Sequence, residues 1–222
     1  MPDKSLSSSQ RAVQELRSRI FSGELAAGSD HLESELADLL EMSRTPVREA
    51  VLTLGSQGLL ELRPRKGVRI LPLSPEDMAE VYDVLTELES HAAERAASAN
   101  YGEADLAELA QAIDDMDAAI AKSDLDAWAE ADDRFHSELV RLGRNSRIEA
   151  IVAMMSDQVR RARTTTLFMR PLPTKSNEDH RAVYQAIRDG NPDTARTIHR
   201  KHRQHAKAIL VELLGKHRLR YL

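Results

Sequence analysis

The sequence contains no cysteine, which excludes disulfides, thiolate metal ligands and cysteine nucleophiles. Aromatic residues make up only 4% of its 222 residues, so an all-β fold, which relies on aromatic and β-branched side chains, is not expected. No apolar run approaches the roughly 20 residues of a transmembrane helix, and the polar first ten residues lack the apolar core of a signal peptide. We therefore expect a cytoplasmic, mostly α-helical protein with no membrane partner.

The charge that is present is unevenly distributed. The net charge is −5, but residues 76–149 carry twenty acidic and six basic side chains, whereas residues 150–222 carry six acidic and fifteen basic ones. A chain with excess negative charge repels nucleic-acid phosphates, so any contact with nucleic acid must be local. The first candidate is the basic run RPRKGVR at residues 63–69.

The first third of the chain predicts three short helices followed by a β-hairpin. A serine-rich tail, expected to be disordered, covers residues 1–9, and helical spacing of apolar residues follows at 10–21, at 33–40 and from Thr45 to about residue 57. Thr45 would cap the third helix, with Pro46 at its first position. Alternating runs at 59–63 and 68–71 flank a turn. This pattern predicts a winged helix-turn-helix DNA-binding domain over residues 10–72.

Candidate DNA contacts lie at the start of the third helix. Its apolar stripe leaves Arg44, Thr45 and Arg48 on the opposite face, where an arginine fork can bond the O6 and N7 acceptors of guanine. The alternative is that Arg48 pairs with Glu41 or Glu49 in a solvated helix. The combination of both arginines with the apolar stripe and the basic hairpin favours DNA binding.

The hairpin supplies a second set of candidate contacts. Arg65 and Lys66 at its tip carry positive charge, and Gly67 is small enough to let the hairpin approach the DNA backbone. The alternative is an ordinary solvated turn.

The runs LESELA at 32–37, SRTPVREA at 43–50 and GLL at 58–60 resemble the GntR family of bacterial transcription regulators. The resemblance covers residues 10–72. It implies a homodimer that binds a palindromic double-stranded operator, with Arg44, Thr45, Arg48 and the wing around Lys66 and Gly67 contacting DNA. Some relatives have an arginine where Ser34 stands, and no contact is assigned there.

After a linker at residues 73–75, the sequence predicts only helices. They are expected from residue 76 and at about 103–122, 124–142, 146–168, 177–189 and 192–214, separated by glycines and prolines. Short loops favour antiparallel packing around a central space. The predicted fold class is thus a winged helix-turn-helix followed by an antiparallel all-helical bundle over residues 76–222.

Four ionisable residues occupy apolar stripes of the predicted bundle: Asp132, His136, His180 and His202. Burying them without partners would cost several kcal/mol, so they must satisfy one another or a shared ligand. Three imidazoles and one carboxylate suit a divalent ion such as Zn²⁺, Ni²⁺ or Mn²⁺. The alternatives are a local Asp–His ion pair or a metal-free hydrogen-bonded pocket.

The remaining histidines are less distinctive. His199 and His205 flank His202 and could replace it as a ligand, whereas His31, His91 and His217 have the pattern of surface residues.

The motifs DDRFH at 132–136, GRN at 143–145 and EDH at 178–180, with His202, are similar to the FCD-type effector domain of the FadR subfamily. The resemblance spans about residues 76–216. It implies that Asp132, His136, His180 and His202 bind a metal, with a small organic or sugar acid beside it.

The subfamily often has an arginine where Leu85 stands, so the usual clamp for an effector carboxylate is missing. Arg160 and Arg163 are the candidate substitutes. The alternatives are a less acidic effector, or that both arginines form a solvated basic face.

We therefore expect a ligand-responsive DNA-binding regulator and not an enzyme. The expected role is a repressor that an effector releases from its operator, with activation as the alternative. The alternative is a metal-dependent hydrolase with an accessory binding domain, for which Glu138 is the candidate base. No general base stands at a convincing spacing from the four candidate ligands.

Overall fold

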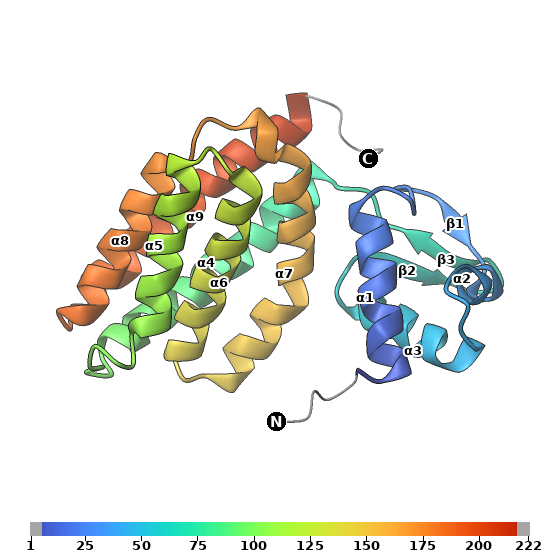
Figure 1. The fold of residues 1–222 in the computed structure, drawn as a ribbon, viewed down its shortest axis with the longest axis horizontal. Coiled ribbons are helices and arrows are strands. Elements are labelled where there is room, and N and C mark those ends of the chain that lie inside the picture. The colour runs from blue at the N-terminus through green and yellow to red at the C-terminus, as the bar shows by residue number, and fades with distance from the viewer. Residues whose placement is uncertain (1–5, 217–222) are drawn as a thin grey trace. The chain divides into compact units, whose positions relative to one another are not determined.

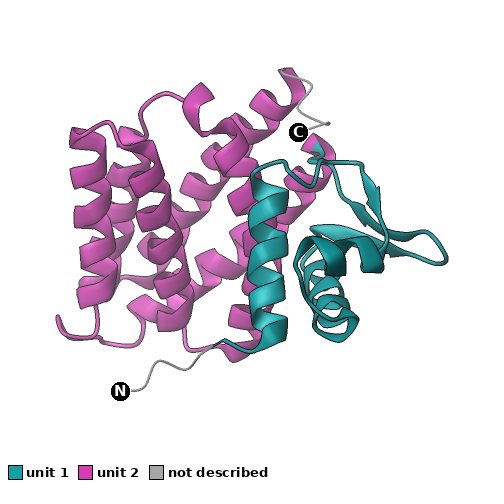
Figure 2. Cartoon of the chain, turned by 45° about the vertical axis from the view of Figure 1, so that its right-hand side comes forward, with its two compact units in different colours: residues 1–74, 217–222 teal, residues 75–216 magenta. Residues whose placement is uncertain are grey.

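The computed structural model describes residues 6–216, and the chain divides into two compact units at Ser74 and Pro75 (Figure 2). The predicted tail falls partly outside the described residues, at positions 1–5. Its last residues are not disordered: helix α1 (Ser8–Phe21) begins at Ser8, because Ser7 and Gln10 form a capping box. Residues 217–222 of the predicted second domain also lie outside the description.

The first unit is a winged helix-turn-helix (Figure 1). It contains α1, α2 (Glu33–Leu39) and α3 (Arg44–Ser56), with strands β1 (Asp30–His31), β2 (Leu60–Arg63) and β3 (Gly67–Ile70) in the antiparallel order β1-β3-β2. One apolar core joins the helices to the sheet. Its fully buried members include Leu16, Ile20, Leu36, Val47, Val51, Leu54, Val68 and Ile70.

Helix α3 starts earlier than the sequence pattern predicts. Ser43 is the N-cap residue and Arg44 the first helical residue, so Thr45 is not the cap and Pro46 is the third helical position, where it is buried. Proline needs no amide donor there, because the first-turn amides have no partner within the helix.

The second unit, Pro75–Lys216, contains only helices among its described residues: α4 (Pro75–Ala97), α5 (Ala107–Ala121), α6 (Leu125–Leu142), α7 (Ser146–Thr166), the 3-10 helix η1 (Leu167–Met169), α8 (Thr174–Arg188) and α9 (Pro192–Lys216). The most extensive helix pairings are α4 with α9 and α5 with α6. Apolar stripes from α4, α5, α6, α8 and α9 form the core, which includes Phe135 and Trp128. The predicted mostly α fold class is confirmed.

Two differences from the predicted helices reflect local chemistry. Residues 103–106 precede α5 as turns, with the Asp105 carboxylate accepting the amide of Gly102. Helix α8 begins at Thr174, three residues before the predicted start.

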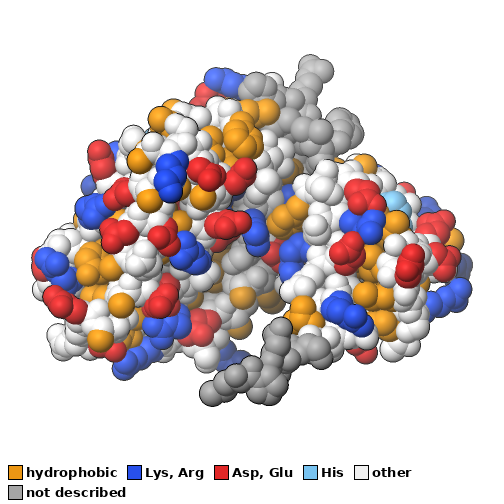
Figure 3. Space-filling view, in the orientation of Figure 1, with side chains coloured by type: hydrophobic (Ala, Val, Ile, Leu, Met, Phe, Trp, Pro, Cys, Tyr) orange, Lys and Arg blue, Asp and Glu red, His pale blue; other side chains and the backbone are white. Residues whose placement is uncertain are grey.

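Charge on the bundle surface is mixed. On the face of the second unit seen in Figure 3, acidic and basic side chains are interspersed, in keeping with surface ion pairs such as Arg134–Asp115. None of the helices in residues 6–216 has the length and apolar character that a membrane span requires.

Candidate functional sites

The exposed face of α3 carries the predicted DNA contacts. Arg44, Thr45 and Arg48 are exposed, whereas Val47 and Ala50 on the other face are fully buried. Within residues 6–216, no ion pair or side-chain hydrogen bond engages Arg44 or Arg48. The alternative pairing of Arg48 with Glu41 or Glu49 is therefore not what the structure shows, and both guanidinium groups face solvent.

Glu49 has another partner. Its carboxylate accepts a hydrogen bond from the hydroxyl of Ser9, a residue of α1.

The wing, the turn between β2 and β3, and the start of α3 line a common groove. Arg65 and Lys66 are exposed in the turn between β2 and β3, and a groove lined by α2, the start of α3 and this turn contains Arg44, Arg65 and Gly67. The structure thus brings part of both predicted contact sets to one surface.

Gly67 serves the wing itself, a role that the sequence pattern did not indicate. Its φ is +85°, and a Cβ placed there would overlap the carbonyl oxygen of His31 in β1. Glycine is therefore required for β3 to pair with β1, whatever its distance from DNA.

The four ionisable residues predicted from the bundle stripes meet in the second unit. The Nε2 atoms of His180 on α8 and His202 on α9 are 3.2 Å apart, and the Oδ1 atom of Asp132 on α6 lies 3.5 Å from His180 Nε2 and 3.8 Å from His136 Nε2. His180, His202 and Asp132 are at most 5% exposed. Three helices therefore direct polar atoms to one point, as the stripes predicted.

These separations suit a metal ion. Bonds of about 2.0–2.2 Å in a tetrahedral site place ligand atoms somewhat more than 3 Å apart. Burial lowers the pKa of His136 and of His180 well below the value of free imidazole. Neutral imidazole keeps the lone pair that a metal needs. The residues present therefore fit a divalent ion.

Arg163 is buried beside this cluster. Its guanidinium donates to Asp132 Oδ2 and to Asp133 Oδ1. Burial opposes its charge, but the two carboxylates outweigh that effect and raise the pKa of Arg163. The alternative of a solvated basic face is therefore wrong for Arg163. Arg160 is half-exposed, with its Nε 3.6 Å from Asp133 Oδ2.

A second polar group, which the sequence analysis missed, adjoins His136. Glu89 Oε2 on α4 lies 3.0 Å from His136 Nδ1 and 3.4 Å from His199 Nε2, and Glu89 Oε1 lies 3.3 Å from an Arg203 nitrogen. Glu89 is 2% exposed. Its signal was available, since Glu89 stands four residues after the stripe residue Leu85.

His199 does not take the place of His202. It contacts Glu89 and the Ser90 hydroxyl, 3.2 Å from its Nδ1, whereas His202 reaches His180. His205 is exposed.

The other histidines play no part in the cluster. His91 pairs with Glu94, His31 contacts the Ser29 hydroxyl, and His217 lies outside the described residues. Glu138, the candidate base of the hydrolase alternative, is held by Arg141 through two contacts of 2.6 Å.

A cavity of about 180 Å³ lies next to the histidine cluster. Its lining includes Leu85, His136 and three arginines, Arg160, Arg163 and Arg203. Leu85 leaves α4 without a cation at this cavity, whose arginines come from α7 and α9. The carboxylates of Glu89, Asp133 and Asp157 also line it.

Comparison with known proteins agrees with this architecture. Residues 8–70 match the bacterial regulatory proteins of the gntR family, and residues 80–205 match the FCD domain. An uncharacterized HTH-type transcriptional regulator in the TAR-I ttuE-ttuC' intergenic region of Agrobacterium vitis is 41% identical over 58% of this chain and 77% of its own length. The gluconate operon transcriptional repressor of Bacillus licheniformis is 34% identical over 63% of this chain and 58% of its own length.

Solved structures share the fold. A GntR transcriptional regulator from Rhodococcus sp. RHA1 superposes with a TM-score of 0.73 at 24% identity, covering 93% of this chain and 99% of the other. E. coli McbR/YncC gives a TM-score of 0.74 at 22% identity, covering 93% and 98%. The family consists of regulators rather than enzymes, and nothing supports the hydrolase alternative. The chain belongs to the GntR family of bacterial transcriptional regulators, with an FCD domain, and is a DNA-binding transcription regulator.

Proposed function

We propose that this regulator is a homodimeric repressor whose helical unit binds a divalent metal ion and, beside it, a small organic acid that releases the operator. The observation that carries the proposal is the convergence of three imidazoles from α6, α8 and α9, with Asp132 Oδ1 3.5 Å from His180 Nε2, next to a cavity whose lining includes three arginines. The gluconate operon repressors among the relatives support the repressor role.

In the first unit, Arg44, Thr45 and Arg48 read base edges in the major groove, while Arg65 and Lys66 hold the phosphate backbone. The two arginines of α3 are exposed and free of protein partners in the described chain, so binding DNA breaks no internal ion pair. In a two-fold symmetric dimer, two copies of α3 would match the half-sites of a palindromic operator.

Arg48→Ala tests the groove contact. A bidentate arginine–guanine pair contributes about 1–3 kcal/mol of discrimination, so specific operator affinity should fall roughly 5- to 150-fold. A gel-shift titration measures this, with circular dichroism to verify folding. Arg11→Ala, an exposed change on α1, is the matched control. Unchanged affinity in a folded Arg48→Ala protein would rule out the contact.

In the second unit, Asp132, His136, His180 and His202 would hold the metal. Asp132 can serve two partners at once, because Oδ1 faces the imidazoles while Oδ2 accepts from Arg163. Glu89 Oε2 lies 3.0 Å from His136 Nδ1, although the two atoms form no hydrogen bond in the structure, and a proton on Nδ1 would leave Nε2 as the ligand atom. A bound ion would supply Lewis acidity toward an acidic oxygen of the effector.

The double variant His136→Ala/His180→Ala tests the ligand set. Removing two of four ligands should reduce bound metal to a small fraction of one equivalent, measured by elemental analysis of protein purified in the presence of Zn²⁺, Ni²⁺ or Mn²⁺. His205→Ala, an exposed histidine on α9, should retain the metal. One equivalent of metal in the double variant would refute the assigned ligands.

Arg160 and Arg163 are placed to hold the acid group of the effector. Both line the cavity beside His136, and the half-exposed Arg160 can turn toward a ligand without leaving a buried carboxylate unpaired. A thermal-shift titration with gluconate, with and without chelator, tests this assignment. The wild-type shift should need metal and shrink in Arg160→Ala. A shift of equal size in chelator would contradict binding beside the ion.

A further inference from the structure

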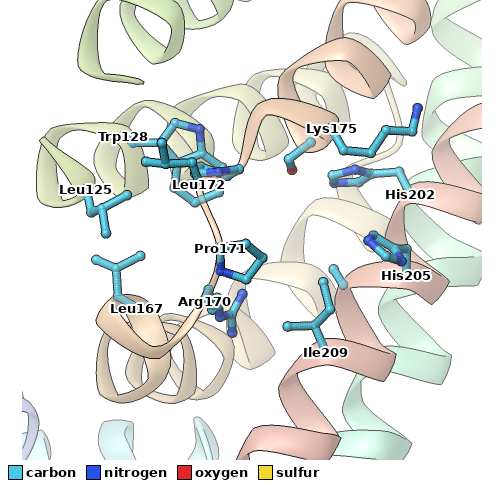
Figure 4. A pocket seen from close by; sticks show the side chains of 13 residues that line it. Leu125, Trp128, Leu167, Arg170, Pro171, Leu172, Lys175, His202, His205 and Ile209 are labelled. Atoms are coloured by element: carbon cyan, nitrogen blue, oxygen red, sulfur yellow. The ribbon is translucent and has the colours of Figure 1, made fainter. Parts of the chain in front are cut away.

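A second cavity, separate from the one lined by Arg160 and Arg163, lies at another part of the helical unit. It has a volume of about 100 Å³ and is walled by the start of α6, the segment from η1 to α8, and α9 (Figure 4). Its walls are mainly apolar, with Leu125, Trp128, Leu172 and Ile209 among them. His202, one of the proposed metal ligands, also lines the cavity, whereas these four apolar residues are not used in the function proposed above.

Arg170 brings a positive charge to this apolar cavity. Its side chain lies between Pro171 and Ile209 in Figure 4. Its Nε and one terminal nitrogen both donate to the Thr166 hydroxyl, at 3.1 and 2.8 Å. Thr166 is itself fully buried. Within residues 6–216, no carboxylate lies within ion-pair distance of Arg170.

This lack of a counter-ion sets Arg170 apart from the other cation of the cavity. Lys175 is neutralised by Asp179, 2.7 Å away. Burial lowers the pKa of Arg170, yet a guanidinium remains charged at neutral pH. A partly buried cation with unused donors and no carboxylate partner is costly unless an anion joins it.

We propose that this cavity is a second ligand site, for a short-chain monocarboxylate whose carboxylate pairs with Arg170 and whose alkyl chain packs against Trp128, Leu125 and Ile209. The volume admits only a short alkyl chain, since this cavity of about 100 Å³ is smaller than the dry apolar cavity of about 150 Å³ that accommodates benzene. The charge fits, because guanidinium and carboxylate match in a bidentate pair. Binding here needs no metal ion, and the charged partner is Arg170 rather than Arg160 or Arg163 of the effector cavity, although His202 borders both this cavity and the proposed metal site.

Trp128 gives the site a direct reporter. It is the only tryptophan of the chain, it lines this cavity, and its indole is held by a 2.9 Å hydrogen bond from Nε1 to Asn177 Oδ1. Its fluorescence should therefore respond to a ligand in this cavity, and it does not line the cavity beside His136.

The experiment is a fluorescence titration of the full chain with pentanoate in the presence of chelator, with pentan-1-ol as the uncharged analogue. Pentanoate should change Trp128 emission saturably, and pentanol should bind at least tenfold more weakly. Arg170→Met should weaken pentanoate binding at least tenfold, while Arg160→Met, at the other cavity, should leave it unchanged.

A variant that fills the cavity distinguishes loss of ligand binding from loss of folding. Ala206→Phe places a ring in the cavity and should abolish the response while the circular dichroism spectrum is retained. The proposal is overturned if pentanoate gives no saturable change, if pentanol binds equally well, or if Arg170→Met binds normally. Binding that disappears in chelator or in His136→Ala/His180→Ala would also overturn it, by assigning pentanoate to the metal site.

Discussion

At the residue scale, the conformation of the wing depends on a single glycine, Gly67. Gly67 adopts φ +85° directly against the His31 carbonyl, whereas Gly23 adopts φ +80° with no atom within 4 Å of where a Cβ would stand. Gly67→Ala should combine backbone strain with a clash and destabilise the first unit by several kcal/mol, while Gly23→Ala should cost only about 1 kcal/mol. Urea unfolding followed by circular dichroism compares the two variants. An equal loss of unfolding free energy in the two variants would mean that β1 shifts to make room for the Cβ atom at position 67.

The buried histidines make the stability of the second unit depend on pH. Burial lowers the pKa of His136, His180 and His199 well below the unfolded value of about 6.5. Below pH 6.5 the unfolded chain therefore binds more protons than the folded chain. The contribution of these histidines to stability is fully present above that pH and is lost as the pH falls. Below pH 6.5, each of these histidines lowers the free energy of unfolding by about 1.4 kcal/mol per pH unit of acidification.

Unfolding by urea in the presence of chelator, followed by Trp128 fluorescence between pH 7.5 and 5, measures this dependence. His199→Gln should lower the slope by about one third, because it removes one of three such groups. A free energy of unfolding that stays constant down to pH 5 would show that these imidazoles charge without cost.

The residues that sequence reasoning placed correctly are those on regular stripes. Asp132, His136, His180 and His202 follow the 3.6-residue period of their helices, and they meet where the stripes predicted. Glu89 lies on the apolar stripe of α4, but it was missed because a glutamate on a long charged helix is ordinarily solvated. It is buried against His136 of α6 and Arg203 of α9, and the stripe of α4 alone does not say which helices pack against it.

At the scale of elements, α3 has a buried packing face and an exposed face that carries the proposed DNA contacts. Leu54 is fully buried in the first core, whereas Leu52, two residues away, is 53% exposed. Leu54→Ala should lower the free energy of unfolding by about 2–5 kcal/mol through the transfer and cavity costs. Leu52→Ala should change it by less than about 0.5 kcal/mol.

Chemical denaturation measures both leucine variants. Below the unfolding transition, the folded fraction of Leu54→Ala should bind operator with unchanged affinity, because Leu54 faces the core and not the groove. A folded Leu54→Ala protein that had lost operator binding would show that the two faces of α3 are not independent.

Element prediction was most accurate where apolar periodicity runs for several turns. The bundle helices were placed within a few residues at each end, except at the start of α5, where the Asp105 turn delays the helix. Strand β1 was missed altogether, because two residues cannot show a period. Its position depends on Gly67 and on pairing with β3, a contact between segments more than thirty residues apart.

At the scale of the whole molecule, each of the two units has a core of its own, and the proposed metal ligands all belong to the second. A ligand that binds only the folded state stabilises it by about 2.7 kcal/mol at a concentration of 100 times its dissociation constant. Trp128 lies in the core of the second unit, so its fluorescence reports the thermal unfolding of that unit. The midpoint of this unfolding should rise when Zn²⁺ replaces chelator. His136→Ala/His180→Ala should show no shift, and His205→Ala should shift as the wild type does. If the double variant gained the same stability from Zn²⁺, the ion would be acting elsewhere on the chain, and the histidine cluster would be only a buried polar network.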